Sequence, residues 1–188
     1  HMQIYFSNNQ MSSLLTQKKW DGKLLDTGGD YLFVVNSNLG GTKSNYYVEN
    51  SMLYEINSMT RDGLLRANLY LDYKNNAESD AWPGGPYTDY VRVLVQDGSK
   101  LTGAKIIFNN GTEEDIFEKV ITSKVGRYTS FESSFKLPPR EFVRLVFNYD
   151  LPTRLSITKD NNFYSLLWQK QSGTNRDNFS FTFNPNEL

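Results

Sequence analysis

The sequence predicts an all-β fold, an antiparallel β-sandwich of roughly nine or ten strands with a short N-terminal helix. Two observations lead to this prediction. Short apolar or alternating runs of strand length follow one another along the 188-residue chain, and turn-forming residues separate them. Aromatic residues make up 14% of the chain although its mean hydropathy is low, at -0.56, which fits strands with one buried and one wet face.

The chain is expected to hold one main domain after a short leading segment. Residues 1–2 match the remnant of an expression tag and are set aside. Residues 3–22 are expected to be the end of a preceding region, and residues 23–188 to form the sandwich. A chain of this length suits a single main core.

The leading segment is predicted to contain a short strand over residues 3–6 and the one helix of the chain. Asn8 or Asn9 can cap this helix, because an asparagine side chain accepts hydrogen bonds from free amides of the first turn. Apolar residues then recur at the helical period as far as Lys18, where a basic end suits the helix dipole.

The rest of the chain is predicted to be strands separated by turns. The expected strands are residues 31–35, a hairpin over 52–73 with its turn at 61–63, and then 90–96, 105–108, 116–123, 128–137, 142–149, 163–169 and 179–183. Residues 179–183 alternate strictly and give the clearest two-residue period. Pro138 and Pro152 are expected to end the strands before them, because proline cannot donate to a sheet ladder.

The composition excludes several kinds of chemistry. The chain has no cysteine, and its one histidine, His1, belongs to the tag remnant. This excludes thiol nucleophiles, Ser-His-Asp triads and imidazole metal ligands. The net charge of -1, from 20 basic and 21 acidic residues, gives no electrostatic attraction toward nucleic acid. We therefore predict no catalytic residues, no metal site, no cofactor and no nucleic-acid partner.

The first candidate ligand-binding site is the elbow, residues 36–45, the most densely specified turn in the sequence. Its motif residues are Asn38, Gly40, Gly41, Lys43 and Asn45. Paired glycines permit unusual backbone angles, and asparagine and serine side chains can bond their own backbone. The spacing does not match a phosphate-binding loop, which needs a longer gap between its glycines and an adjacent Gly-Lys pair. A structural bend and a ligand-gripping loop both remain open.

The second candidate site is the proline- and glycine-rich loop around Trp82. Trp82, Tyr87 and Tyr90 are expected either to present flat rings to a sugar or to pack against the core. Acidic side chains in and around this loop and at residues 113–115 allow two further interpretations, a glycosidase carboxylate pair or a calcium site over residues 80–89. Solvated surface charge is the simpler interpretation, since the alternating spacing of known calcium loops is absent.

Several phrases of the sequence, taken in order, resemble a bacterial family. They are residues 20–22, 30–32, the elbow, 87–92, 98–99, 149–152, Tyr164 and 169–174. Their order and spacing are similar to the C-terminal β-rich region of the domain of unknown function 4012 family, over nearly the whole chain. Proline would be expected at Gln96 or Asp97 and at Ser172, so turn geometry differs there. The resemblance implies a membrane-anchored bacterial envelope protein with a helical extracytoplasmic region and this β-rich distal end, and it supplies no catalytic residue.

We expect, from the loops and the resemblance, a non-catalytic extracytoplasmic module at the cell surface. Its partner would be a surface polysaccharide, a cell-wall component or an envelope protein, and contact with a membrane would come only through the N-terminal anchor of the parent. Two alternatives remain open. One is a structural spacer or assembly unit whose edge strand, residues 179–183, pairs with another chain. The other is a carboxylate-dependent glycan hydrolase of the envelope.

Overall fold

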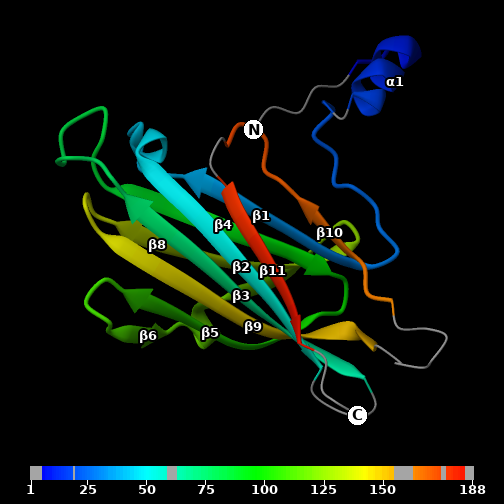
Figure 1. The fold of residues 1–188 in the computed structure, drawn as a ribbon. Helices are drawn as coiled ribbons and strands as arrows, with labels where there is room; N and C mark the ends of the chain where they lie inside the picture. The colour runs from blue at the N-terminus through cyan, green and yellow to red at the C-terminus, as the bar shows by residue number, and fades with distance from the viewer. Residues whose placement is uncertain (1–5, 19, 59–62, 155–162, 175–176, 185–188) are drawn as a thin grey trace.

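The computed structural model describes residues 6–18, 20–58, 63–154, 163–174 and 177–184, which form a β-sandwich with one α-helix (Figure 1). The predicted fold class is confirmed. Eleven strands in these ranges form two sheets that pack against each other. Most of the predicted strand at residues 3–6 and of the predicted turn at residues 61–63 lies outside the described residues.

The two sheets hold five and six strands. The first sheet has the order β10-β1-β4-β8-β7, and its strands are β1 (Asp30–Asn38), β4 (Tyr87–Gln96), β7 (Ile121–Val125), β8 (Tyr128–Leu137) and β10 (Leu166–Gln169). The second sheet has the order β11-β2-β3-β9-β5-β6, and its strands are β2 (Val48–Ser58), β3 (Leu64–Asn75), β5 (Lys100–Phe108), β6 (Glu113–Asp115), β9 (Phe142–Arg154) and β11 (Asp177–Asn184).

The prediction of a wholly antiparallel sandwich is wrong at one edge of each sheet. β10 pairs with β1 in parallel, and β11 pairs with β2 in parallel, whereas the other pairs are antiparallel. The alternation of a strand shows which residues face inward but not the direction in which the strand runs. That direction depends on how the connection crosses between the sheets, because parallel neighbours need a long crossover.

Several predicted strand boundaries are also wrong, among them the starts of β5 and β10, and for two others the structure shows a local cause. The predicted strand 116–123 begins only at β7, because a 3-10 helix, η2 (Phe117–Lys119), precedes it. The Asp115 Oδ1 atom accepts a hydrogen bond of 2.8 Å from the Phe117 amide and so starts this turn. Pro152 does not end β9, which continues to Arg154 through an irregularity in its pairing with β3, where a missing donor is tolerated.

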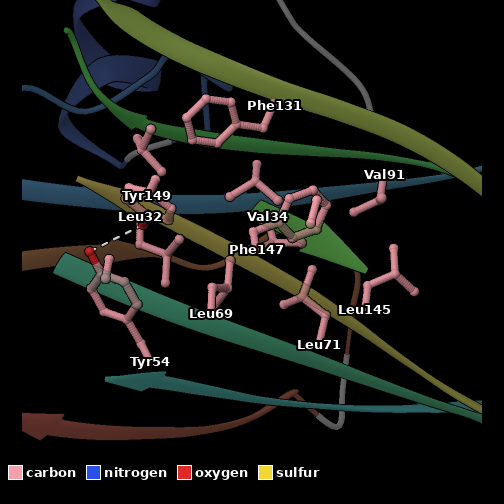
Figure 2. Packing of buried hydrophobic residues seen from close by; sticks show 14 of the residues in the cluster. Leu32, Val34, Tyr54, Leu69, Leu71, Val91, Phe131, Leu145, Phe147 and Tyr149 are labelled. Carbon is pink, nitrogen blue, oxygen red and sulfur yellow. Dashed lines mark hydrogen bonds between the residues drawn. The ribbon is translucent and has the colours of Figure 1, made fainter. Parts of the chain in front are cut away.

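The core lies between the sheets and follows from the two-residue period of the strands. On β3, alternate residues from Leu65 to Tyr73 are buried, while those between them are only partly covered. Figure 2 shows Leu69 and Leu71 of β3 on one side of the core and Phe131 of β8 on the other. Burying each such large apolar side chain stabilises the fold by about 2 kcal/mol before the cost of ordering it.

The predicted helix is confirmed as α1 (Asn9–Gln17), which extends away from the sandwich in Figure 1. The Asn8 side chain caps it and accepts hydrogen bonds from the Gln10 and Met11 amides at 2.9 and 3.2 Å. No helix in the described part of the chain is long and apolar enough to cross a membrane.

The segment that follows α1 lies on the outer face of the first sheet. The side chain of Gln169 holds it there. The Gln169 Oε1 atom accepts hydrogen bonds from the Leu25 amide at 2.9 Å and the Tyr31 hydroxyl at 2.6 Å, and Gln169 Nε2 donates to the Lys23 carbonyl at 3.1 Å. The segment seals a second, smaller apolar cluster that includes Tyr31 and Tyr128. This gives a structural role to the first glutamine of the 169–174 phrase.

Candidate functional site: a polar cleft at one end of the sandwich

At one end of the sandwich, the inward-facing row of side chains changes from apolar to polar. On β1, for example, Asn36 follows the core residues Leu32 and Val34 at the same two-residue spacing. The inward polar residues at this end are Asn36 on β1, Asn50 on β2, Asn75 on β3 and Asp89 on β4. Polar groups at core positions cost stability unless they find partners. Asn36 and Asn75 have such partners, whereas side-chain oxygens of Asn50 and Asp89 do not have one in normal geometry.

Two of these inward residues, Asn36 and Asn50, line a cleft of about 1140 Å³, which we call the end cleft. Three segments surround it: the elbow with the short 3-10 helix η1 (Ser44–Tyr46), the start of β2 beside the end of β3, and the turn at residues 171–174. Its amide side chains are Asn36, Asn38, Asn45, Asn50, Asn76 and Gln171. A cleft of this size can hold a ligand of several rings, and its lining is chiefly polar.

The elbow owes its shape to one asparagine side chain. Asn38 Nδ2 donates to the Thr42 carbonyl at 3.1 Å and the Ser44 hydroxyl at 3.3 Å, and Asn38 Oδ1 accepts from the Gly40 amide at 2.9 Å. Gly41 has φ +69°, a backbone angle that favours glycine. The interpretation of the elbow as a structural bend therefore accounts for both glycines and for Asn38.

The structure brings the two predicted candidate loops together. The Lys43 amide donates to the Pro83 carbonyl at 2.9 Å, and the Leu39 amide donates to the Thr88 carbonyl at 2.8 Å. The elbow and the Trp82 loop therefore form one continuous surface at this end of the molecule. Sequence alone indicated each loop separately and gave no sign of this contact.

Only half of the predicted site residues line the end cleft. Those that do are Asn38, Lys43, Asn45 and Tyr87, and those that do not are Gly40, Gly41, Trp82 and Tyr90. Trp82 is 75% exposed, so it does not pack into the core. Tyr90 lies on the outward-facing phase of β4, where its hydroxyl donates to Glu132 Oε2 at 2.5 Å.

The floor of the end cleft contains a buried acceptor without a partner. Asn50 Oδ1 is buried and has no hydrogen-bond donor, and Asn50 lines both the cleft and a recess of about 10 Å³ beneath it. Asn36 and Gln171 also line both spaces. The recess is about the size of one water molecule or one hydroxyl group. The recess and the unpartnered Asn50 oxygen therefore belong to the same part of the cleft.

A second glutamine, Gln171, fixes the far wall of the end cleft through two hydrogen bonds that we call the Gln171 clamp. Gln171 Oε1 accepts from the Asn36 amide at 2.8 Å, and Gln171 Nε2 donates to the Asn36 carbonyl at 3.0 Å. These two hydrogen bonds continue the β1–β10 ladder, with the Gln171 side chain in place of a backbone amide. The Tyr73 hydroxyl donates to Asn36 Oδ1 at 2.7 Å and so holds the side chain of Asn36 as well.

The sequence analysis missed two aromatic residues of the cleft, Tyr47 and the more exposed Tyr46. Tyr46 is 84% exposed, and its ring meets the ring of Tyr47 edge-on at 5.4 Å. A ring held this way offers a large flat face at little entropic cost. The signal was present, because the tyrosine pair follows the elbow directly, but nothing in the sequence showed that one ring would stay in solvent.

Asp89 gives this end of the sandwich an unusual electrostatic feature. Its side chain is fully buried, and neither carboxylate oxygen has a partner in normal hydrogen-bond geometry. Burial raises the pKa of Asp89 to about 7, although the nearby Tyr87 hydroxyl and the Ser37 and Tyr90 amides act in the opposite direction. Burial first, and then the charge of Asp89, raise the pKa of Tyr87 as well.

The carboxylates considered for catalysis lie elsewhere or are engaged in ion pairs. Glu113 pairs with Lys105 at 2.8 Å and Glu114 pairs with Lys119 at 2.5 Å, in agreement with the surface-charge interpretation. Among the described residues that line the end cleft, Glu49 is the one carboxylate. In the same described part of the chain, no group of three or more histidine, cysteine, aspartate or glutamate residues could hold a metal ion. The cleft offers hydrogen bonds, two lysines and aromatic faces.

Comparison with known proteins gives no family for the chain. No protein-family profile matches it, and no curated protein matches it, so the resemblance to the family of unknown function 4012 stays a prediction. Among solved structures, a candidate nutrient-binding protein from Legionella pneumophila is similar with a TM-score of 0.39 and 10% identity, over 65% of this chain and 44% of that one. An M1 zinc metallopeptidase from Deinococcus radiodurans is similar with a TM-score of 0.26 and 15% identity, over 57% of this chain and 23% of that one. The chain spans less than half the length of either protein, and a similarity at these TM-scores says nothing about function.

Proposed function

We propose that the protein is a non-catalytic recognition module whose end cleft binds a polyhydroxylated ligand, a glycan. The observation that carries the proposal is the open polar cleft of about 1140 Å³ with the unpartnered Asn50 acceptor in its floor. An acceptor that stays buried and unpaired in the free protein costs stability, and a ligand hydroxyl that bonds to it removes that cost.

The remaining chemistry of the cleft matches what a sugar presents. Amide side chains such as Asn45 and Asn76 can both donate and accept, as hydroxyl groups do. Tyr46 supplies a flat exposed face for the apolar side of a sugar ring. The Gln171 clamp and the Asn38 network hold two walls of the cleft before any ligand arrives, which reduces the entropy lost on binding.

The biological setting in this proposal is the bacterial cell envelope, and it rests on the family resemblance alone. The module would lie outside the cytoplasm on a membrane-anchored parent, and its ligand would be a surface or cell-wall glycan, or a glycan carried by an envelope protein. The end cleft would then be the part of the domain that contacts this ligand.

A glycan-binding experiment with three variants tests the proposal. Wild-type protein is applied to an array of neutral and acidic oligosaccharides, and each hit is measured by isothermal titration calorimetry. Tyr46→Ala removes the exposed ring and Asn50→Leu replaces the unpaired amide with an apolar group of similar size. Each is expected to weaken binding about tenfold or more, because a stacking face or a buried hydrogen bond is lost.

Trp82→Ala is the matched control, since Trp82 is an exposed aromatic residue near the elbow that does not line the cleft. It should bind like the wild type. Binding that survives Tyr46→Ala and Asn50→Leu but is lost in Trp82→Ala would move the site to the Trp82 loop and overturn the assignment to the cleft. Failure of the wild type to bind any glycan on the array would overturn the proposed function.

A further inference from the structure

Four strands form the edges of the two sheets among the described residues: β7 and β10 in the first sheet, and β6 and β11 in the second. An edge strand presents a row of backbone N–H and C=O groups to which another strand can bind. Soluble proteins usually prevent such pairing with short edge strands, charged side chains, proline or bulges. An edge that lacks these features is therefore a candidate interface.

Three of the four edges have such protection. β6 has three residues, all of them acidic (Glu113–Asp115). β7 has five residues and carries Lys124, which pairs with Asp97 at 2.6 Å. β10 has four residues. None of these strands offers a long neutral edge to a partner.

β11 is different in length and in charge. It has eight residues and pairs with β2 without a register shift from Asp177 to Asn184. The sequence from Asn178 to Asn184 contains no charged residue and no proline. Its outward-facing side chains include Ser180 and Thr182, which are exposed. In Figure 1, β11 (red) lies beside β2 at the end of its sheet.

The inward side of β11 adds an apolar surface next to this edge. Phe179 stacks on Trp168 with ring centroids 4.3 Å apart, and Phe181 stacks on Tyr164 at 5.8 Å. These contacts close the side of the sandwich between β11 and β10, but Phe181 is still 41% exposed. A strand added along β11 would cover part of this aromatic surface.

We propose that β11 pairs in antiparallel fashion with β11 of a second copy, so that two six-stranded sheets join into one. Two identical strands related by a two-fold axis satisfy each other's free backbone groups. Neutral serine, threonine and asparagine side chains then meet across the axis, where charged residues of one sign would repel. This self-complementary chemistry favours a second copy over a strand of unrelated sequence.

Sedimentation of the full chain from low to high micromolar concentration tests the pairing. Wild-type protein is expected to pass from monomer to dimer as concentration rises. The double variant Ser180→Lys/Thr182→Lys should weaken the dimer about tenfold or more, because it places like charges opposite one another at the new junction. Thr122→Lys, at an exposed position on the protected edge β7, is the matched control and should dimerise like the wild type.

Cysteine cross-linking gives a second measurement that does not depend on these lysines. Because the chain has no cysteine, Ser180→Cys alone, Thr182→Cys alone and a mixture of the two test three registers of the pair. The combination that lies directly opposite should form a disulfide-linked dimer on mild oxidation, and Thr122→Cys should not. A wild type that stays monomeric at every concentration would overturn the proposal. The proposal would also be overturned if the protein dimerises but the double lysine variant does not weaken the dimer and the β11 cysteines do not cross-link it. Neither result bears on the end cleft.

Discussion

Two aspartates lie inside this sandwich, and they differ in almost everything except burial. Asp30 is 4% exposed and Asp89 is 0% exposed. Asp30 Oδ2 accepts hydrogen bonds from the hydroxyls of Tyr54 at 2.6 Å and Tyr164 at 2.5 Å, and its Oδ1 accepts from an amide. Neither oxygen of Asp89 has a partner in normal hydrogen-bond geometry. The comparison shows that burial alone does not define a structural carboxylate, because its partners decide what it does.

The Asp30 cluster fastens the two sheets together. Asp30 belongs to β1 of the first sheet, whereas Tyr54 belongs to β2 and Tyr149 to β9 of the second. The Tyr149 hydroxyl donates to the Tyr54 hydroxyl at 3.2 Å and extends the network within the second sheet, from β2 to β9 (Figure 2). Burial raises the pKa of Asp30, and the tyrosine hydrogen bonds partly offset this effect. A polar network with every member bonded makes this region rigid.

The Asp89 end has the opposite character. The Asp89 carboxylate has contacts with Tyr87, Ser37 and Tyr90 but no partner in normal hydrogen-bond geometry. Asn50 Oδ1 also lacks a partner, and Asn50 lines the end cleft. Proteins keep unsatisfied buried groups chiefly where function requires them. The sandwich therefore has one region whose buried polar groups bond to one another and one whose buried polar groups do not, and the proposed ligand site lies at the second.

Removal of Asp30 should produce the largest loss of stability. Asp30→Ala leaves the buried Tyr54 hydroxyl and the half-buried Tyr164 hydroxyl without this acceptor, and we expect a decrease in the free energy of unfolding of about 4 kcal/mol. Urea unfolding followed by tyrosine and tryptophan fluorescence measures it. Tyr164→Phe, which removes one of the two donors and leaves Asp30 bonded to Tyr54, should cost only about 1 kcal/mol. An equal loss in the two variants would show that the network does not act through Asp30.

Replacement of Asp89 should increase the free energy of unfolding at alkaline pH, whereas replacement of Asp30 decreases it. Its pKa is about 7 in the folded protein and 3.8 in its ordinary state, so the folded protein keeps the proton between these values. The stability that this proton contributes is fully present below about pH 4 and is lost as the pH rises through 7. Wild-type stability should therefore fall across this window, by at most about 4 kcal/mol from this group.

Asp89→Asn removes the titration and should be more stable than the wild type at pH 8 by about 2 kcal/mol, the remainder offset by burial of an amide. Urea unfolding at pH 5 and pH 8 measures the difference. The same substitution at Asp30 should destabilise the protein at both values, because an amide is a poorer acceptor for two tyrosines. A pH profile of Asp89→Asn that parallels the wild type would contradict this account of Asp89.

The strands could be predicted from sequence because alternation is a local signal. The buried row of β3, from Leu65 to Tyr73, has the spacing that its pattern predicts. The parallel direction of β10 and β11 could not be predicted, since it depends on connections between the sheets. The same distinction explains Pro152, which β9 tolerates only because its pairing with β3 is irregular there.

The sequence could predict only the part of the site that is formed by residues close together in the chain. The elbow stood out because Asn38 and its glycines lie within a few residues of one another. The end cleft did not, because Gln171 is 135 residues away from Asn36 in the sequence and the two meet only through the parallel β1–β10 pair. One local signal was available: Asn50 interrupts the inward apolar phase of β2, which a strict reading of the two-residue period would have found.

Two glycines, one in the elbow beside the end cleft and one just before Asp30, give the prediction with the smallest expected effect. Gly41 in the elbow has φ +69° and open space around an added Cβ atom, so Gly41→Ala meets backbone strain without a clash. We expect it to lower the free energy of unfolding by about 1 kcal/mol. Gly28 lies two residues before Asp30, also has open space, and does not have a left-handed φ. Gly28→Ala should be neutral or slightly stabilising, because it reduces the entropy of the unfolded chain.

The two alanine variants also separate the shape of the elbow from the stability of the fold. If the elbow forms a wall of the end cleft, Gly41→Ala should weaken glycan binding by more than its small loss of stability explains, and Gly28→Ala should bind like the wild type. Calorimetry of both variants at a temperature where each is fully folded makes this comparison. Equal binding by the two would mean that the elbow is a bend with no part in recognition, and the cleft would then depend on Tyr46, Asn50 and the 171–174 turn alone.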